Sequence, residues 1–440
     1  MNEPASHLSN TFRLIVTGGG TGGHTYPALT AVRALQTRLA AEGRTLDVLW
    51  IGTPEGLEAR VAPAEGIAFT TVATGKIRRS ANPLKMISPA NVKDMARVPL
   101  GVAQARRIVS DFRPDVVLAT GGYVAVPAGL AARMCKRPLV LHEQTVRLGL
   151  ANRKLAGSAA RIAVSSESTL PLLPEAVRSL AVVTGNPIRP EVLTGHADKA
   201  VAALGLTGFD RRLPTLYVTG GAQGAQQINN VVRDALPWLL ERANIIHQCG
   251  PANVEALRAS AAGLPPHLTG RYYLTGFVGP ELPDVLALAD IVVSRSGAGT
   301  LAELTALGKP AVFVPLASSA GNEQAHNARH LEDAGAAVAL TGDVTADRLR
   351  NALGPLLTDP ARRAGMAEAA RAHGRPDAAD RLVDVLLSAA TGGWPSRERA
   401  PVRRVRRVPG RVLVVARGFP RDGAVLVPAT GLQAEATRFA

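Results

Sequence analysis

The sequence predicts an α/β fold made of two doubly wound, Rossmann-like domains whose parallel sheets face a cleft. Short apolar runs without polar alternation recur along the chain, separated by Ala-, Leu- and Arg-rich stretches of helical pattern. Such runs are typical of parallel strands that helices cover on both faces. Both halves also repeat one scheme, in which a strand leads through a Gly-rich turn into a helix. Ligands of such folds bind at the carboxyl ends of the strands, so we expect a site between the domains.

Ten apolar runs are expected to be strands. In the first half they are 13–19, 46–52, 115–122, 138–144 and 161–166, and in the second half 214–221, 244–250, 272–278, 290–297 and 310–316. Turn residues bound each run, and helical stretches separate successive runs. We expect the joint between the halves near 183–190. The predicted parts are therefore 1–185, 186–392 and an extension, 393–440.

Length and composition indicate an ordinary globular protein. The chain has 440 residues, of which 46% are hydrophobic and 19% charged, enough for two or three domains with sizeable cores. Cys135 and Cys249 are far apart and form no CxxC pair, so they are expected to be reduced core residues rather than disulfide or zinc ligands. The first twenty residues have no apolar segment typical of a signal peptide. The apolar run 116–132 is interrupted by glycine and proline, so we expect no membrane-spanning helix.

The formal charge of +15 suits three kinds of partner: nucleic acid, an anionic membrane surface or a polyphosphorylated substrate. An aromatic content of 4% argues against a base-stacking platform, and we expect no nucleic-acid partner. Basic and apolar residues are interleaved in 75–107, which is typical of a segment that docks on anionic lipid. A solvated helix pair is the alternative. The segment 391–440 carries ten Arg against three acids and is interpreted as a basic, anion-binding arm, either unstructured or with a small hairpin.

The first Gly-rich turn follows the strand at 13–17 and reads GGGTGGH over 18–24. Glycines after a strand let backbone N–H groups approach an oxyanion closely, and the next helix adds the positive end of its dipole. Pro27 is expected in the first turn of that helix, where its missing N–H costs nothing. The spacing is not that of a nicotinamide-binding GxGxxG motif. His24 ends this turn, and although a lone histidine is often structural, we predict that it accepts a proton from an attacking hydroxyl.

Two further turns of this kind lie in the second half. One is GGAQGA at 220–225, and the other is SGAGT at 296–300, and each again follows a strand and precedes a helix. Equivalent turns at the start of both domains indicate a nucleotide-type ligand held between them. Glu303 lies one turn into the last helix, where its carboxylate can accept ribose hydroxyls. The alternative for Glu303 is simple complementation of the helix dipole.

Taken together, these residues resemble the MurG family of glycosyltransferases over about residues 12 to 385. The motifs that carry the resemblance are GGGTGGH with Pro27, GKIRR at 75–79, ATGGYVAVP at 119–127, HEQ at 142–144, GLAN at 149–152, TGNPIR at 184–189, GGAQGA at 220–225, RSGAGTLAE at 295–303 and EQAHNA at 323–328. The resemblance implies the GT-B fold and transfer of GlcNAc from UDP-GlcNAc to undecaprenyl-linked lipid I, which gives lipid II for peptidoglycan. The implied transfer is inverting and needs neither a cofactor nor a metal.

On the acceptor side, the resemblance places the residues of the first turn at the cleft, where they would contact the acceptor diphosphate and the donor sugar: Thr21, Gly22, Gly23 and His24. His24 would be the catalytic base. Thr145 stands where the family usually has Asn, after HEQ. Arg189 would face donor or phosphate charge from the joint. The first domain, 1–185, would bind the acceptor and face the membrane.

On the donor side, the resemblance implies that 186–392 binds the UDP-sugar. Ala222 would meet the donor phosphate, and Val278 would hold uracil through its backbone. The diphosphate would be cradled by Ala298, Gly299 and Thr300. Glu303 would bind the ribose. Gln324, with Glu323 assisting, would bind the sugar hydroxyls, and such contacts discriminate between hexosamines.

Two departures bear on these roles: Thr145 replaces Asn, and Ala222 lacks the hydroxyl that the family usually has there. A missing side-chain donor to a charged oxygen, such as the hydroxyl absent at Ala222, costs roughly 1–3 kcal/mol if nothing compensates. Two alternatives therefore stay open, a GT-B transferase for another acceptor and a non-catalytic UDP-sugar-binding scaffold. Because the implied acceptor is lipid-linked, we expect a peripheral protein on the cytoplasmic side of the cell membrane, in contact with anionic inner-leaflet lipids.

Overall fold

The computed structural model describes residues 10–75, 89–392, 406–408, 411–414 and 425–428. Contacts divide the chain into two units, Met1–Gly393 and Trp394–Ala440, which are treated separately below. Most of the expected GKIRR motif, with Lys85 of the basic-apolar segment, lies outside the described residues.

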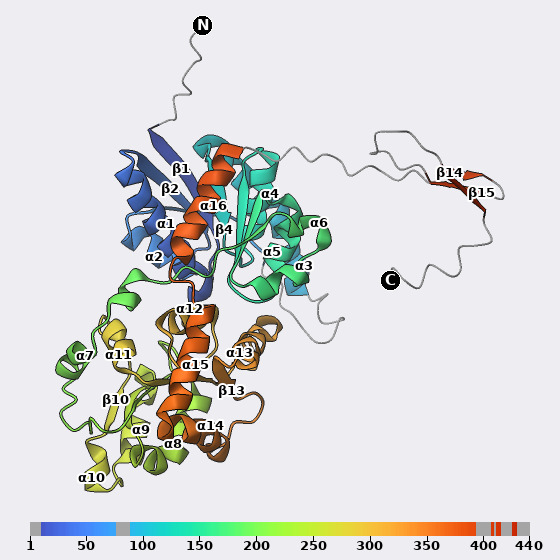
Figure 1. Cartoon of the computed structure of the whole chain (residues 1–440). Helices are drawn as coiled ribbons and strands as arrows, with labels where there is room; N and C mark the ends of the chain where they lie inside the picture. Colours follow the sequence, from blue (N-terminus) through green and yellow to red (C-terminus); the bar gives the residue numbers. More distant parts are fainter. Residues whose placement is uncertain (1–9, 76–88, 393–405, 409–410, 415–424, 429–440) are drawn as a thin grey trace. The chain divides into compact units, whose positions relative to one another are not determined.

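The first sheet has seven parallel strands in the order β3-β2-β1-β4-β5-β6-β7 (Figure 1). Their bounds are β1 Thr11–Thr17, β2 Thr45–Gly52, β3 Ala68–Thr71, β4 Val116–Ala119, β5 Leu139–Glu143, β6 Arg161–Val164 and β7 Ala181–Val183. The connecting helices are α1 Gly22–Ala41, α2 Glu58–Ala64, α3 Pro89–Phe112, α4 Ala125–Met134, α5 Leu150–Leu155 and α6 Glu175–Arg178. Pairing of β1 with both β2 and β4 makes β1 central, which is typical of a doubly wound sheet.

Successive residues of β1 enter different cores. Leu14 and Val16 are buried with residues of α1, whereas Ile15 is buried with residues of α3 and α4. Neighbouring side chains of a strand point to opposite faces of the sheet. A strand covered on both faces therefore needs apolar residues at every position, which explains the continuous apolar run in the sequence.

The second sheet has six parallel strands in the order β10-β9-β8-β11-β12-β13. Their bounds are β8 Thr215–Thr219, β9 Asn244–Gln248, β10 Tyr272–Thr275, β11 Ile291–Ser294, β12 Ala311–Phe313 and β13 Ala337–Ala339. The helices are α7 Ala197–Ala203, α8 Gln226–Leu240, α9 Val254–Ala261, α10 Pro266–Thr269, α11 Leu282–Leu288, α12 Ala298–Leu307, α13 Glu323–Asp333, α14 Ala346–Thr358, α15 Pro360–His373 and α16 Ala378–Gly392. Short 3-10 segments are η2 Ala156–Ser158, η3 Glu167–Leu172, η4 Pro190–Thr194, η5 Pro251–Asn253 and η6 Ala320–Asn322.

All ten expected strands are present, and the expected pair of parallel α/β sheets is confirmed. In the two parallel sheets, three strands were not predicted, namely β3, β7 and β13. Each has only three or four residues and lies at the edge of its sheet. An edge strand this short is defined by the neighbour with which it pairs rather than by its own pattern.

The first helix begins earlier than the sequence indicates. We expected Pro27 in the first turn, but α1 starts at Gly22, so Pro27 lies in the second turn. A proline there cannot donate the usual hydrogen bond to the carbonyl four residues back, which belongs to Gly23. The prediction was wrong because two glycines, poor helix formers by propensity, form the first turn.

The last helix of the first unit, α16, packs on the first sheet although it follows the second in sequence. It lies beside α1 and contacts β4 (Figure 1). Leu382, Val383 and Leu386 are buried in the same core as Leu14 and Val16 of β1. The helix thus groups with the first sheet, not with the remainder of 186–392, where sequence order would put it.

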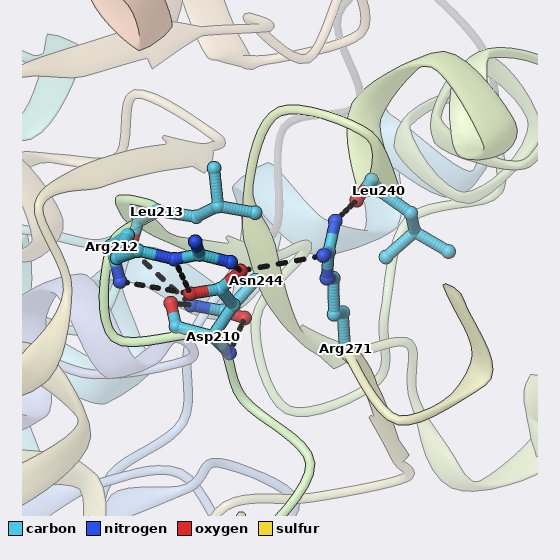
Figure 2. Close-up of polar contacts among 6 residues, drawn as sticks. All are labelled: Asp210, Arg212, Leu213, Leu240, Asn244 and Arg271. Carbon is cyan, nitrogen blue, oxygen red and sulfur yellow. Dashed lines mark hydrogen bonds and ion pairs between the residues drawn. The ribbon is translucent and has the colours of Figure 1, made fainter. Parts of the chain in front are cut away.

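A polar cluster holds the loop before β8 at the amino edge of the second sheet (Figure 2). The Asp210 carboxylate accepts hydrogen bonds from Arg212 and from the Arg271 guanidinium, at 2.9 and 3.4 Å. Asn244 binds the backbone of Asp210 through both amide atoms, at 2.8 and 2.9 Å. The hydrogen bonds from Arg212, followed by the charges of Arg212 and Arg271, lower the pKa of Asp210 to about 2. Because β8, β9 and β10 all begin here, the cluster lies opposite the carboxyl edge and has a structural role.

In the C-terminal unit the structure describes three short antiparallel strands, β14 Arg406–Val408, β15 Arg411–Val414 and β16 Val425–Pro428. The hairpin that the sequence offered as an alternative corresponds to β15 and β16. In the part of the chain that the structure describes, no helix is both long and apolar enough to span a bilayer.

Candidate functional site

Three Gly-rich turns follow strands at their carboxyl ends, as the sequence predicts. They join β1 to α1, β8 to α8 and β11 to α12. None of the three helices has an acidic residue in its first turn. Carboxylates are the usual complement of a helix N-terminus, so their omission from all three favours an external anion there. Helices α1 and α12 also contact each other, which brings the turns of the two sheets together.

In the first turn, the backbone donors of Gly22 and Gly23 are available to a ligand. Thr21 precedes α1 with an extended backbone, but its side chain does not cap the helix. Among the described residues, the N–H groups of Gly22 and Gly23 have no hydrogen-bond partner. Thr21 and Gly23 are exposed. This geometry fits the predicted role of these residues in binding an oxyanion.

A buried carboxylate that the sequence analysis missed, Glu58, holds this turn from beneath. It accepts a hydrogen bond from the Gly20 N–H at 2.8 Å and from the Thr53 backbone and hydroxyl at 3.0 and 3.1 Å. A Cβ on Gly19 would lie 2.1 Å from the Glu58 carboxyl carbon. Glycine is therefore required above the carboxylate. The one sequence signal was the pair of glycines, at 52 and 56, that surround the same side chain.

His24 is half-buried and contacts the loop that follows β5. Its Nδ1 lies 3.0 Å from Oε1 of Gln144. Its carbonyl accepts a hydrogen bond from the Thr120 hydroxyl at 3.1 Å. Gly121, with φ of +109°, packs against the ring, and a Cβ there would lie 2.9 Å from His24 Cε1. The ring is thus held by Gln144 and Gly121, and Thr120 holds the backbone of His24, all three distant in sequence.

Thr145, predicted to be a binding residue, uses its side chain within its own loop. Its hydroxyl lies 2.8 Å from Glu143 Oε1 and 2.7 Å from the Arg147 carbonyl. Glu143 is buried, and its second oxygen accepts from the Gly149 N–H and from Asn152, at 2.8 and 2.9 Å. Glu143 therefore holds this loop in shape.

The second turn, after β8, leaves Ala222 exposed. A Cβ on the neighbouring Gly221 would meet no heavy atom within 4 Å, so space above the turn is open. Gln248 steadies the turn by donating to the Thr219 hydroxyl and the Gly221 carbonyl, at 3.1 and 3.0 Å. The same amide accepts from the Val278 N–H at 2.8 Å. Of the backbone groups of Val278, the carbonyl is thus the one left for a ligand.

The third turn presents the N-terminus of α12. Ala298, Gly299 and Thr300 are half-buried, and their N–H groups have no hydrogen-bond partner among the described residues. A Cβ on Gly299 would meet nothing within 4 Å. Open space, donors without a partner and the helix dipole together suit an anion, and the predicted diphosphate role of these residues stays a prediction.

Arg189 and Glu303, predicted separately, form an ion pair. The Arg189 Nε and Nη2 donate to the same carboxylate oxygen, Oε1, at 3.0 and 2.9 Å. Burial raises the pKa of Glu303, and the Arg189 charge opposes that change. Among the described residues, Glu303 Oε2 has no hydrogen bond and can accept one from a ligand.

Gln324, at the start of α13, is tied to the third turn. Its carbonyl accepts from the buried Ser296 hydroxyl at 2.8 Å, and its side-chain Oε1 accepts from the Leu316 N–H at 2.9 Å. Among the described residues, the side-chain NH₂ of Gln324 has no hydrogen-bond partner. Asn322, the residue before α13, has a positive φ of 57°. The structure thus brings Gln324 to Ala298–Leu307, which sequence spacing alone did not show.

A cavity of about 400 Å³ lies between elements of the two sheets. Gln144, Ser166 and Asn186 line it from the first half and the joint, and Ala298 and His330 from the second. Ser166 Oγ lies 3.3 Å from His330 Nε2. The predicted location of a site between the halves therefore corresponds to a real hollow beside the α12 turn.

Comparison with known proteins identifies the family. The profile "Glycosyltransferase family 28 N-terminal domain" matches residues 14–164, and "Glycosyltransferase family 28 C-terminal domain" matches 215–382. A UDP-N-acetylglucosamine--N-acetylmuramyl-(pentapeptide) pyrophosphoryl-undecaprenol N-acetylglucosamine transferase of Listeria monocytogenes serotype 4b is 36% identical over 379 residues, covering 86% of this chain and 99% of the relative. The protein of the same name from Lacticaseibacillus casei is 34% identical over 381 residues, covering 86% and 98%.

Solved structures agree. The crystal structure of Acinetobacter baumannii MurG has a TM-score of 0.68 at 30% identity, covering 86% of this chain and 99% of that one. A Neisseria meningitidis UDP-GlcNAc 2-epimerase, at 18% identity and a TM-score of 0.59, shares the fold alone. Both profiles match this chain, and relatives above 30% identity align over nearly their whole length. The chain therefore belongs to glycosyltransferase family 28 and is MurG-like, as its motifs predicted.

Proposed function

We propose that this enzyme transfers GlcNAc from UDP-GlcNAc to N-acetylmuramyl-(pentapeptide) pyrophosphoryl-undecaprenol, the lipid I of peptidoglycan synthesis, to form lipid II. The observation that carries the proposal is the near-complete alignment with transferases named for this reaction. The chain also has His24 on the first turn and a donor-rich start of α12. A non-catalytic UDP-sugar-binding scaffold would need the α12 donors but not His24.

UDP-GlcNAc is proposed to bind along the carboxyl edge of the second sheet. The free N–H groups of Ala298, Gly299 and Thr300 face the diphosphate, with the α12 dipole behind them. Glu303 accepts the ribose hydroxyls through Oε2, and Arg189 keeps that carboxylate charged. The Val278 carbonyl accepts a hydrogen bond from the imide N–H of uracil. The Val278 N–H already donates to Gln248 and has no bond to offer a uracil carbonyl.

The hexose is proposed to lie between Gln324 and the first turn, where His24 meets the acceptor. The acceptor 4-hydroxyl attacks the anomeric carbon on the face opposite UDP, and its proton passes to His24 Nε2. A C1–O4 bond forms while the bond from C1 to the β-phosphate oxygen breaks, and the configuration at C1 inverts. The negative charge that develops on departing UDP is stabilised by the amide donors of α12.

The two departures from the family pattern have local substitutes. Thr145 keeps its loop closed through Glu143 and the Arg147 carbonyl, so the loop has its shape without the usual Asn. Beside Ala222, the open space above Gly221 gives the donor phosphate room for contact with backbone groups or water. We therefore propose that the substrates are unchanged.

Docking on anionic inner-leaflet lipids, at the cytoplasmic face of the membrane, is also part of the proposal. One face of α3 exposes Arg97, Leu100 and Arg107, spaced three and seven residues apart, and Leu100 is 54% exposed. Met134, at the end of α4, is 52% exposed, next to Arg133. Apolar side chains among cations suit an anionic lipid surface, where the acceptor's lipid is anchored.

Turnover tests the proposal directly. Purified enzyme with UDP-GlcNAc and a soluble lipid I analogue should release UDP. His24→Gln should lower kcat by roughly 10²–10⁴-fold, the usual contribution of a general base, while UDP-GlcNAc binding stays unchanged. The matched control is His267→Gln, because His267 is exposed on α10, before the amino end of β10. UDP release with a different acceptor alone, or donor binding without turnover, would refute the assignment.

A further inference from the structure

A continuous series of side-chain contacts links His24 to the joint between the two sheets. His24 Nδ1 lies 3.0 Å from Gln144 Oε1, and Gln144 Nε2 lies 3.0 Å from His142 Nδ1. His142 Nε2 lies 3.1 Å from the carbonyl oxygen of Gly185. His142 and Gln144 are both buried. The first and last members of the series come from α1 and from the segment after β7.

The direction of each hydrogen bond follows from one additional contact. The same end of the Gln144 amide that meets the His142 ring also lies 3.1 Å from the His142 backbone carbonyl. A carbonyl oxygen only accepts, so that end of the amide must be the NH₂ group. The other end is then the amide oxygen. It can only accept a hydrogen bond, so His24 Nδ1 must carry a hydrogen and donate it.

The same logic assigns the protons of both rings. His142 Nδ1 faces an NH₂ donor and must be unprotonated. Its Nε2 faces the Gly185 carbonyl, which also accepts from the Thr184 hydroxyl at 3.0 Å, and must carry the proton. His142 is therefore neutral with hydrogen on Nε2. His24 is protonated on Nδ1 in its neutral form, with the lone pair on Nε2.

We propose that Gln144 and His142 are positioning residues that hold His24 in the tautomer whose Nε2 is free to accept the proton of the acceptor hydroxyl. His24 Nε2 has no hydrogen-bond partner among the residues that the structure describes. Proton uptake at Nε2 leaves the Nδ1–H bond to Gln144 in place, so no side chain has to turn during the reaction. This inference rests on the proposed function, which makes His24 the base.

The far end of the series is anchored firmly. Gly185 has φ of +85°, and a Cβ there would lie 2.6 Å from Arg375 Cβ and 2.9 Å from Ala378 Cβ. Gly185, in the segment after β7, is thus packed against the start of α16 and the residues just before it, where the chain passes back to the first sheet. The hydrogen-bonded series that sets the tautomer of His24 therefore ends at a tightly packed backbone carbonyl, not at a surface side chain.

The surroundings support a neutral His142. Burial is the main cause that lowers the pKa of His142 to about 4. The hydrogen bond to the Gly185 carbonyl opposes this change, and the charge on His24 contributes to it. The groups packed on His24 itself are Thr120, Gly121 and Gln144, none of which carries a charge. When His24 takes the proton, His142 therefore stays neutral and keeps its bond to Gly185.

Nitrogen NMR on the full chain labelled with ¹⁵N-histidine tests the proposal without turnover. The His24 signals, assigned by their loss in His24→Gln, should be those of a neutral ring protonated on Nδ1. Gln144→Met should release the ring into a mixture containing the Nε2–H form, whereas Gln144→Glu, which keeps an acceptor at that position, should restore the Nδ1–H form. A wild-type His24 protonated on Nε2, or no change in Gln144→Met, would overturn the proposal whether or not the enzyme turns over lipid I.

Kinetics provide a second readout. Gln144→Met should lower kcat by about tenfold or more, without exceeding the loss in His24→Gln, and should leave the KM for UDP-GlcNAc unchanged. Gln144→Glu should recover most of the lost rate. Equal losses in the Met and Glu variants would indicate a merely structural role and would contradict the inference.

Asn152→Leu is the matched control for disturbance of the same loop. Asn152 donates to the His142 carbonyl at 3.0 Å and to Glu143 at 2.9 Å, but it contacts no ring nitrogen. This variant should lower the melting temperature while His24 keeps the Nδ1–H tautomer. A tautomer change in Asn152→Leu as large as that in Gln144→Met would show that loop integrity, not Gln144, sets the proton position.

Discussion

Individual buried polar residues in this protein are held by complementary partners on more than one side. His247 on β9 is an example, since its Nε2 lies 3.1 Å from Asn229 Oδ1 and its Nδ1 lies 3.0 Å from the Tyr272 hydroxyl. Asn229 uses its NH₂ on the Cys249 carbonyl, so His247 donates from Nε2 and accepts from Tyr272. The ring is thus neutral, and burial lowers its pKa to about 4.

This low pKa predicts a loss of stability in acid. Below its ordinary pKa near 6.5, the histidine of the unfolded chain binds a proton, but the folded ring stays neutral until pH approaches 4. The stabilisation is therefore complete above about pH 6.5 and is lost as pH falls. His247 should account for a decrease of about 2 kcal/mol in the free energy of unfolding between about pH 7.5 and pH 5. Urea unfolding of His247→Gln at both pH values should show a shallower decrease than the wild type.

His267→Gln serves as the control, because that side chain is exposed. It should retain the full decrease of the wild type. An unaltered pH dependence in His247→Gln would mean that the buried ring is not the source.

At the scale of elements, an acidic residue at the start of α12 should increase the stability of the helix and weaken the binding of UDP-GlcNAc. Gly299→Asp would place a carboxylate in open space in the first turn, where it complements the dipole and stabilises the helix by about 0.3–1 kcal/mol. The same charge would repel the diphosphate, so we expect the Kd for UDP-GlcNAc to rise roughly tenfold or more. Calorimetric titration and thermal unfolding would measure the two effects separately.

Gly299→Ala is the matched variant, since a Cβ there meets nothing within 4 Å. It should stabilise the helix by about 0.5–1 kcal/mol and leave donor affinity within about twofold. Undiminished donor binding in Gly299→Asp would remove α12 from the proposed diphosphate site.

The exposed face of α3 carries the proposal of membrane docking. Leu100→Glu should weaken binding to phosphatidylglycerol-containing vesicles roughly tenfold, because a buried leucine contributes about 1.5–3 kcal/mol. Cosedimentation would measure this, while activity on a soluble acceptor stays unchanged. Leu172→Glu is the control, since Leu172 on η3 is similarly exposed, at 50%. Equal binding by the two variants would argue against docking through α3.

At the scale of the whole molecule, removing the C-terminal unit alone and removing it together with α16 should affect stability differently. The chain after Gly393 forms a separate unit, so removing 394–440 should leave the melting temperature of the remainder unchanged. Removing 378–440 would also delete α16 with its buried Leu382, Val383 and Leu386, and would expose the core of the first sheet that they cover. We expect a loss of roughly 5 kcal/mol or more of stability, or failure to fold. The melting temperatures of the two truncated proteins test whether α16 stabilises the first sheet. Similar values would contradict the packing of α16 described above.

The sequence by itself determined the two parallel sheets, their ten principal strands and the three glycine turns that precede helices. These features are local, because an apolar run, a glycine after a strand and a helix without early acids each act within a few residues. His24 and the start of α12 could be predicted for that reason. The resemblance to a known family then supplied roles for residues such as Arg189 and Gln324 that spacing did not.

Only the tertiary structure decided the features that join distant segments. Glu58 lies 38 residues from the Gly20 amide that it accepts, and Gln144 lies 120 residues from His24. The pairing of Arg189 with Glu303, the return of α16 to the first sheet and the edge strands are of the same kind. Sequence patterns report what one segment needs, namely burial or a backbone angle. They do not report which remote partner meets that need, because the partner is chosen when the sheets and helices pack.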